Sequence, residues 1–425
     1  MPHLRESLSV TVVTAAIVLL APATAAGAAE PVLVGFDKGV SKQRQGKIVD
    51  ALGGRIAKRF SAVRGGRLVV VHPRGGLRAK ALRKALGRAK GVSYAEPDST
   101  LSTSATRQPD DPDYPFQYAL VDSPSGQDID APTAWSTRTS CSTVAILDTG
   151  IDTDHPDLAP NIYKSSDKPN NGKDDDKNGF VDDTYGLNVI KGKGSGEDDN
   201  GHGSHVAGIV GGRGDNALGV SGICWSTKLI AVKFMNSKGK GSTSDAIDGI
   251  QYAAKKGAKI INCSFGSSSK SSSLHDAVDY AQSKGSLLVV AAGNDGDNID
   301  KKPEYPAAYT DSNILTVAAT TSTDTLASFS NYGATAVDVG APGNQILSTY
   351  KGGGYKLLSG TSMASPYAAG VAAMLRKQES EATYSDLRYA IRHKVDLPIA
   401  LNGKVAYNGR LNARKALAAI PSLVD

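Results

Sequence analysis

The sequence has few cysteines, since Cys141, Cys224 and Cys263 are the only three in 425 residues. Three are too few for a disulfide scaffold, and no pair has the C-x-x-C spacing of a thiolate metal site, so both classes are excluded. Cys141 and Cys224 each stand just before an apolar run, and adjacent parallel strands could bring them together in an oxidising compartment. The sequence leaves their pairing open. Cys263 lies inside the apolar run 260–263, where a free thiol acts as a small hydrophobe.

Long hydrophobic runs are also missing. The N-terminal run, residues 10–21, has 12 residues, well short of the roughly 20 that a membrane-spanning helix needs. Arg5 precedes this run and small residues follow at 23–29, which is the pattern of a cleaved signal peptide over residues 1–29. No later stretch reaches spanning length, so we expect a secreted, extracellular protein with no membrane association in its mature form.

Most of the chain lacks net positive charge, although the whole sequence carries +6. Residues 30–102 hold 16 Lys and Arg against 5 Asp and Glu, whereas residues 103–425 hold 31 against 36. A nucleic-acid surface would need basic residues to persist in the mature protein, so we expect no nucleic-acid partner. The opposite charges of the two segments indicate an intramolecular electrostatic fit.

The sequence divides into two parts with a polar junction. Residues 31–97 alternate β-rich runs with helical patterns at 42–52 and 79–89, which predicts a small α+β (ferredoxin-like) domain. Residues 99–106 are small and polar without periodicity, a composition that stays exposed and is easily cut. We therefore expect a first domain over residues 30–104 and a second over residues 105–425.

The second part alternates continuous apolar strands with helices such as 243–255. This pattern predicts an α/β fold with a doubly wound parallel sheet buried on both faces. In such sheets, sites form beyond the carboxyl ends of the strands. The predicted strands cover residues 144–147, 229–234, 259–263, 287–291 and 314–318.

Four polar residues stand where such a site would form. Asp148 ends the first strand and Asn294 follows a later one, while His202 and Ser362 lie at the starts of helical patterns. They supply a nucleophile in Ser362, a general base in His202, a carboxylate to orient the imidazole, and an amide donor for an oxyanion. Taken alone, Asp148 is more often a strand-end cap, His202 a surface histidine and Asn294 a turn residue, and Ser362 is as often a helix cap. Their joint occurrence favours catalysis.

The segments around these four residues resemble the signature segments of the subtilase family, in the family's order Asp, His, Asn, Ser. The resemblance covers residue 114 to the last helices and implies a subtilisin-like serine endopeptidase, monomeric, with protein or peptide substrates and no cofactor for catalysis. Residues 31–97 resemble the family's inhibitory chaperone propeptide, so we expect a precursor that cuts itself between its two parts. Tyr367 stands in place of the family's usual His, and we expect altered packing there rather than lost chemistry. Ser204 stands in place of the usual Thr and keeps a hydroxyl.

The resemblance also implies substrate-binding residues. A substrate backbone would add as a strand between two extended edges, which are Gly239-Lys240-Gly241 and Ser264-Phe265-Gly266. By the same resemblance, Glu304 approaches the floor of the pocket for the residue before the cut bond. A carboxylate there favours Lys or Arg.

An acidic stretch between Asp148 and His202 predicts a calcium loop. Its oxygen ligands match the first nine positions of such a loop, with Gly179 at the sharp turn. These ligands are Asp174, Asp176, Asn178, the Phe180 carbonyl and Asp182. Tyr185 stands where the Glu of position 12 would be, which excludes a full EF-hand. Structural Ca²⁺ binding, as in similar acidic inserts of some bacterial subtilases, and a solvated loop both stay open.

Three function classes compete: an active endopeptidase, another serine hydrolase such as a lipase, and a secreted pseudoenzyme that binds peptide or calcium. A lipase needs G-x-S-x-G and the order Ser, Asp, His, whereas Ser362 lies in the sequence GTSMA and the order here is Asp, His, Ser. A pseudoenzyme normally has a damaged triad, and every chemical role is filled. We therefore expect an endopeptidase that works through an acyl-enzyme on Ser362.

Overall fold

The computed structural model describes residues 31–98, 106–121 and 126–424. They belong to two compact units, one within 1–101 and the other within 102–425, called here the N-terminal and the C-terminal unit. The predicted signal peptide, residues 1–29, and the predicted boundary between residues 104 and 105 lie outside the described residues. None of the helices in the described ranges combines the length and the hydropathy needed to cross a bilayer.

The N-terminal unit is a four-stranded antiparallel sheet with two helices. Its strands lie in the order β2-β3-β1-β4, and the chain runs strand, helix, strand, strand, helix, strand, which is the ferredoxin-like arrangement. Val34, Val69 and Leu82 are fully buried in its core. The α+β prediction for this segment is confirmed. The elements are β1 (Val32–Phe36), α1 (Lys42–Ala51), β2 (Gly54–Phe60), β3 (Leu68–Pro73), α2 (Ala79–Gly87) and β4 (Val92–Pro97).

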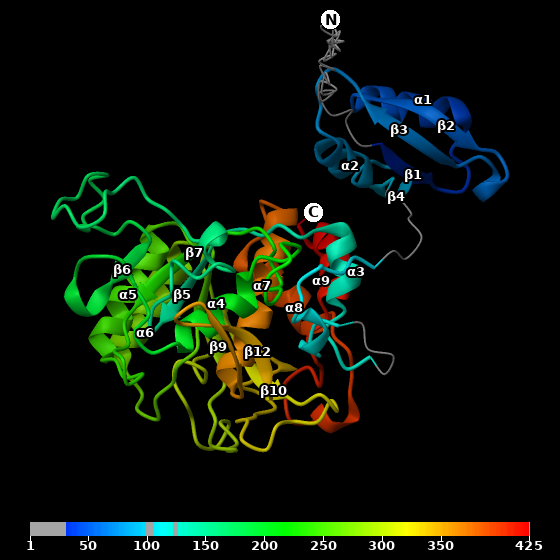
Figure 1. The fold of residues 1–425 in the computed structure, drawn as a ribbon. Coiled ribbons are helices and arrows are strands. Elements are labelled where there is room, and N and C mark those ends of the chain that lie inside the picture. The colour runs from blue at the N-terminus through cyan, green and yellow to red at the C-terminus, as the bar shows by residue number, and fades with distance from the viewer. Residues whose placement is uncertain (1–30, 99–105, 122–125, 425) are drawn as a thin grey trace, which may run out of the picture. The chain divides into compact units, whose positions relative to one another are not determined.

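The C-terminal unit is built on a seven-stranded parallel sheet in the order β11-β10-β9-β8-β5-β7-β6. Figure 1 labels β5, β6, β7, β9 and β10 of this sheet. The doubly wound α/β prediction is confirmed. In chain order the elements are α3 (Ala131–Thr137), β5 (Val144–Asp148), β6 (Gly186–Asn188), α4 (His202–Gly211), β7 (Leu229–Lys233), α5 (Thr243–Lys255), β8 (Ile260–Cys263), α6 (Ser272–Ser283), β9 (Leu287–Ala291), β10 (Ile314–Thr320), β11 (Val339–Pro342), β12 (Ile346–Tyr350), β13 (Gly354–Leu358), α7 (Thr361–Gln378), α8 (Tyr384–His393) and α9 (Ala413–Leu423).

Alternate side chains of β5 enter two hydrophobic cores. Val144 and Ile146 pack in the core that contains α4 and α7, and Ala145 and Leu147 pack in the core that contains α5 and α6. After β5 the chain forms β6 and β7 on one side of it and then β8 on the other. The carboxyl end of β5 therefore lies at the point where the strand order reverses, which is where open α/β sheets bind ligands.

The cysteines settle a question that the sequence left open. Cys141 and Cys224 form a disulfide, and the backbone amide of Cys141 donates to the carbonyl O of Ser226 at 2.9 Å just before β5 and β7 begin. Cys263 is free and buried at the end of β8, as predicted. Tyr367, which departs from the family's usual His, is buried inside α7 and belongs to the core between α7 and the sheet.

Candidate active site

Asp148 and His202 form a hydrogen-bonded pair at the carboxyl edge of the sheet. Asp148 ends β5 and is fully buried, and its Oδ1 accepts a hydrogen bond from His202 Nδ1 at 2.8 Å. His202 begins α4 and follows Gly201, whose φ is 110°. A Cβ at Gly201 would lie 2.3 Å from the ring of Tyr350, so this entry into the helix needs glycine. Because Nδ1 is held by Asp148, Nε2 is the nitrogen that can accept a proton.

The pKa values of the two histidines of this segment are shifted in opposite directions. Burial lowers the pKa of His202, but the Asp148 carboxylate and the more distant Asp198 raise it, so that the pKa lies above its usual value. Burial lowers the pKa of His205 to about 4, and its Nε2 lies 2.9 Å from the carbonyl O of Lys356. His205 is therefore a neutral core residue, and His202 is the candidate general base.

Asp198, which the sequence did not single out, fixes the turn before His202. Its two oxygens accept five hydrogen bonds of 2.7–2.9 Å, from Thr149 Oγ1, the amides of Asn200 and Gly201, and the amide and hydroxyl of Ser204. This carboxylate thus ties the residue after Asp148 to the first turn of α4. It also uses the hydroxyl of Ser204, which a Thr would equally provide.

Replacing Asp198 with Asn should lower kcat by about 10- to 100-fold, because the carboxylate positions His202 and small misplacements of a reacting group are costly. It should also move the acidic limb of the kcat/KM profile to lower pH, since a charge that raises the pKa of His202 is removed. Asp248→Asn, an exposed change on α5, is the matched control. A fall in rate with an unmoved limb would show that Asp198 acts on geometry alone.

Ser362 is the second residue of α7 and is 9% exposed. Its Oγ donates to the carbonyl O of Ser264 at 3.3 Å, longer than the usual O–H···O distance of about 2.7–2.8 Å. Among the hydrogen bonds of the described residues, none joins Ser362 Oγ to His202. A hydrogen bond between a nucleophile and its base is often long or poorly aligned without substrate and tightens only when substrate is bound.

Asn294 is oriented by the residue before Ser362. Its Oδ1 accepts from the amide of Thr361 at 2.8 Å and from Thr361 Oγ1 at 3.0 Å. Gly293, with φ of 103°, donates its own amide to Thr361 Oγ1 at 3.1 Å. With Oδ1 held in this way, Nδ2 is the end of the amide that can donate to a developing oxyanion.

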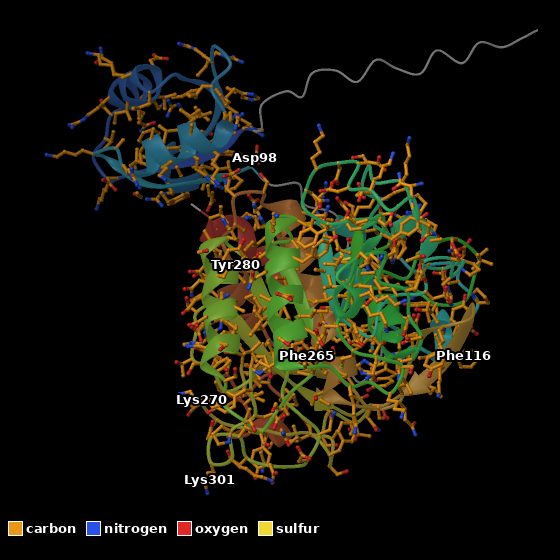
Figure 2. The ribbon with its side chains drawn as sticks, turned by 90° about the vertical axis from the view of Figure 1, so that its left-hand side faces the viewer. Asp98, Phe116, Phe265, Lys270, Tyr280 and Lys301 are labelled. Atoms are coloured by element: carbon orange, nitrogen blue, oxygen red, sulfur yellow. A yellow bond between two sulfur atoms is a disulfide. The ribbon has the colours of Figure 1, made fainter. Side chains whose placement is uncertain are left out.

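A cavity of about 540 Å³ beside His202 is lined by both predicted substrate edges, Gly239-Lys240-Gly241 and Ser264-Phe265-Gly266. Phe265, labelled in Figure 2, packs against Phe234 with ring centroids 4.6 Å apart. Ser267, just after the second edge, pairs with Tyr305 through two backbone hydrogen bonds of 2.8 and 2.9 Å. The structure differs from the prediction at Gly239, which has φ of 67° and closes a turn with Asn236, so the first edge is extended only after it.

Glu304 lies between the second substrate edge and the loop that carries Asn294. A Cβ at Gly266 would lie 2.6 Å from Glu304 Oε1, and a Cβ at Gly293 would lie 3.4 Å from Glu304 Cγ. Burial raises the pKa of Glu304, and the nearby Asp295 raises it further. A cationic side chain of a substrate would stabilise the ionised form of this carboxylate and would lower the pKa of Glu304 again.

The acidic stretch brings carboxylates together in a partly different set. Asp174 and Asp176 each offer an oxygen within 4.8 Å of an oxygen of Asp167, a buried residue that the sequence did not single out. These oxygens are the hard ligands that Ca²⁺ prefers, so Asp167, Asp174 and Asp176 fit that ion. Lys256 Nζ, 3.6 Å from Asp176, supplies part of the charge balance.

Asp182 and Asn178, two other predicted ligands of the acidic stretch, have different partners, whereas at Phe180 the contact involves the ring and not the carbonyl O that was predicted as ligand. Asp182 Oδ1 accepts from the amides of Asn171 and Gly172 at 2.9 and 3.1 Å, so this carboxylate closes the preceding turn. Asn178 Nδ2 donates to Asp183 at 3.1 Å. The ring of Phe180 packs on that of Tyr252, with centroids 4.8 Å apart.

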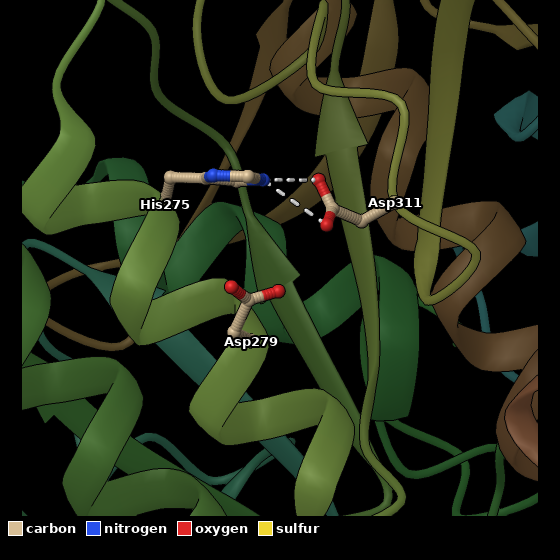
Figure 3. A group of neighbouring side chains, drawn as sticks. All are labelled: His275, Asp279 and Asp311. Carbon is tan, nitrogen blue, oxygen red and sulfur yellow. Dashed lines mark hydrogen bonds and ion pairs between the residues drawn. The ribbon is translucent and has the colours of Figure 1, made fainter.

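A further group of metal-ligating types lies on α6 and just before β10 (Figure 3). His275 Nε2 lies 2.9 and 3.1 Å from the two oxygens of Asp311, and Asp279 stands one helical turn after His275. The ring of His275 also packs on Tyr309 at 4.7 Å between centroids. Because His275 Nε2 is already engaged by Asp311, we interpret the group as a hydrogen-bonded contact that joins α6 to the segment before β10.

Comparison with known proteins gives consistent matches. The family model described as "Subtilase family" matches residues 140–414. "Thermophilic serine proteinase" of Bacillus sp. (strain AK1) is 35% identical over 396 residues, covering 91% of this chain and 86% of that protein. "Thermitase" of Thermoactinomyces vulgaris is 40% identical over 292 residues, covering 68% and 94%. Among solved structures, that of a protease from Pseudoalteromonas arctica matches with a TM-score of 0.61 and 29% identity, covering 74% of this chain and 99% of that one.

Proposed function

Because the chain belongs to the subtilase family and is a serine endopeptidase acting on proteins or peptides, we propose that Ser362, His202 and Asp148 carry its reaction. We further propose that the chain is a secreted precursor, held inactive by residues 30–104 until it cuts itself. The bond between His202 Nδ1 and Asp148 Oδ1 is the observation that supports the first proposal best, since it leaves Nε2 to act as the base.

The reaction has two halves. Ser362 Oγ bonds to the scissile carbonyl carbon while His202 Nε2 takes its proton, and Asp148 stabilises the imidazolium. Asn294 Nδ2 and the Ser362 amide donate to the oxyanion. When the tetrahedral intermediate collapses, His202 gives the proton to the leaving amine and an acyl-enzyme remains. Water, deprotonated by His202, then attacks the ester, and the acid product leaves as Ser362 regains its proton.

An organophosphorus fluoridate tests this assignment, because it bonds to a serine oxygen that a neighbouring base activates. We expect one adduct per processed chain, found by mass spectrometry in the peptide that contains Ser362. His202→Ala should slow the labelling at least about 100-fold. An adduct on another serine, or labelling at equal rate in the His202 variant, would refute the assignment.

Three observations support the secreted precursor. Residues 10–21 with their flanks match a signal peptide. The disulfide between Cys141 and Cys224 suits an oxidising compartment. The likeness to the Bacillus proteinase spans 91% of this chain and so extends beyond the C-terminal unit, into the basic segment whose charge complements the acidic remainder.

Glu304 should select Lys or Arg at the residue before the cut bond. Replacing Glu304 with Gln should lower kcat/KM for a Lys peptide by about 10- to 100-fold, the cost of one charge-assisted hydrogen bond, with little change for a Leu peptide. A peptide panel varied at that residue measures both. If wild type already prefers the Leu peptide and Glu304→Gln leaves that preference unchanged, the pocket assignment is wrong.

Calcium should stabilise the C-terminal unit through Asp167, Asp174 and Asp176. At a free concentration about 100 times its Kd, a bound ion contributes roughly 2.7 kcal/mol, so a chelator should lower the unfolding midpoint of a Ser362→Ala chain. Asp174→Asn should reduce the gain from added calcium, whereas Asp182→Asn should keep it. Equal loss in both variants would favour the ligand set predicted from the sequence, and no response to calcium would exclude the ion.

A further inference from the structure

An open cavity of about 560 Å³ lies at the amino ends of the central strands and is lined by four cations, Lys228, Lys259, Arg376 and Lys377. The rest of its lining consists mostly of serine and threonine side chains and includes no Asp or Glu. We propose that this cavity binds a small multivalent oxyanion of the phosphate or sulfate class. The pocket is called here the basic pocket.

The sheet register places the two strand lysines around β5. Val144 pairs with Leu229 on one side and with Ile260 on the other, so Lys228 and Lys259 immediately precede these partners. Two strand spacings separate them, which puts their Cα atoms about 10 Å apart. An anion lying across the end of β5, beside the hydroxyl of Thr143, can reach both ammonium groups because their side chains are long and flexible.

The end of α7 closes the basic pocket from another direction. The amide and Oγ of Ser142 both donate to the carbonyl O of Ala373, at 3.0 and 3.2 Å. This contact brings the last turn of α7, with Arg376 and Lys377, beside the strand ends. Cations in that turn are also favoured by the helix dipole. Lys228 and Lys259 precede strands, so no helix dipole accounts for their positive charge at this place.

The four cations are not neutralised by the part of the protein that the structure describes, because none of them has a carboxylate oxygen within 4 Å there. Lys228 Nζ and Lys259 Nζ donate instead to the carbonyl O atoms of Pro160 and Lys284. This accumulation occurs in a segment, residues 103–425, that is acidic overall. Like charges gathered in a concave site attract a counter-ion, and hydroxyls add neutral donors for its oxygens.

The basic pocket is separate from the cleft. Asp148 lies at the carboxyl end of β5 and the pocket at the amino end, roughly 15 Å away for a five-residue strand. The proposed anion site therefore goes beyond the peptidase reaction and can be tested independently of it.

Calorimetric titration of the full chain with inorganic tripolyphosphate tests the proposal. The chain carries Ser362→Ala to prevent digestion, and the buffer is calcium-free with about 20 mM salt, where screening is weak. We expect one tripolyphosphate per chain, and a Kd that rises about 10- to 100-fold in Lys228→Gln/Lys259→Gln. Inorganic sulfate, with fewer charges, should bind more weakly.

The matched control is Lys270→Gln/Lys301→Gln, which removes the same charge from two exposed lysines outside the basic pocket (Figure 2). This control should bind tripolyphosphate as the parent does, and all three chains should share one unfolding midpoint. If the control loses as much affinity as the pocket variant, the binding follows net charge and the proposal is wrong. Absence of binding to the parent would overturn it equally.

Discussion

Replacing Ser362 with Ala should lower kcat for a peptide substrate by roughly 10⁶-fold, the size of effect seen when the nucleophile of a serine peptidase is removed. The same change should stop maturation. The intact mass of secreted wild type should correspond to a start near residues 103–113, whereas the variant should still begin near residue 30. The reason is that, in the proposed mechanism, a single hydroxyl would form the acyl-enzyme both on an external substrate and on the chain's own junction.

The matched control for this change is Ser359→Ala, three residues earlier. Ser359 is exposed, its hydroxyl O accepts a hydrogen bond from the amide of Gln345 at 2.8 Å, and it does not line the cavity beside His202. The Ser359→Ala chain should keep the kcat of the wild type and the intact mass of a processed chain. Equal masses for wild type and Ser362→Ala would mean that another enzyme processes the chain or that no processing occurs, and a peptide-binding pseudoenzyme would then become the leading hypothesis.

Replacing Asp148 with Asn should lower kcat by about 10⁴-fold, because an amide no longer holds the imidazole in the correct tautomer or stabilises its cation. The pH profile should also change. The neutral form of His202 is the active one, so activity falls as the pH drops through its pKa, which in wild type lies above the usual value. Without the charge of Asp148, burial dominates, and the acidic limb should move to lower pH.

Asp154→Asn, an exposed change six residues further on, is the control for the Asp148 variant and should leave both the rate and the limb in place. A kcat that stays within tenfold of wild type in Asp148→Asn would show that this carboxylate does not support the general base. An acidic limb that moves to higher pH in Asp148→Asn would show that burial is not the main remaining influence on the pKa of His202.

The parallel sheet could be predicted from the sequence because buried strands read as continuous apolar runs. β9 begins and ends as predicted, and β5, β7, β8 and β10 differ by one or two residues at their ends. The strand β2 was missed because Arg55, Lys58 and Arg59 interrupt its apolar side chains, and a bulge follows Ile56. The short strand β6 was also missed, since it depends on pairing with β7, which is distant in the sequence. The hairpin β12–β13 was missed too, although its two strands are neighbours in the sequence.

A site residue could be predicted where its position follows from a single helix or strand. The position of Asp148 follows from the end of a strand, and that of Ser362 from the start of a helix. The role of Asp198 could not be predicted, because its partners converge only when the turn before α4 meets Thr149 at the end of β5. Asp167 was missed for a similar reason, as it lies seven residues before the acidic run that it joins in space.

The disulfide between Cys141 and Cys224 affects what happens when one molecule of the enzyme cuts another. The two half-cystines are 83 residues apart, and the segment between them contains Asp148, His202 and the acidic stretch, which is partly exposed. A cut in that stretch would therefore leave both fragments covalently joined. The catalytic acid and base would stay on one connected molecule after such a nick, until a reductant opened the bridge.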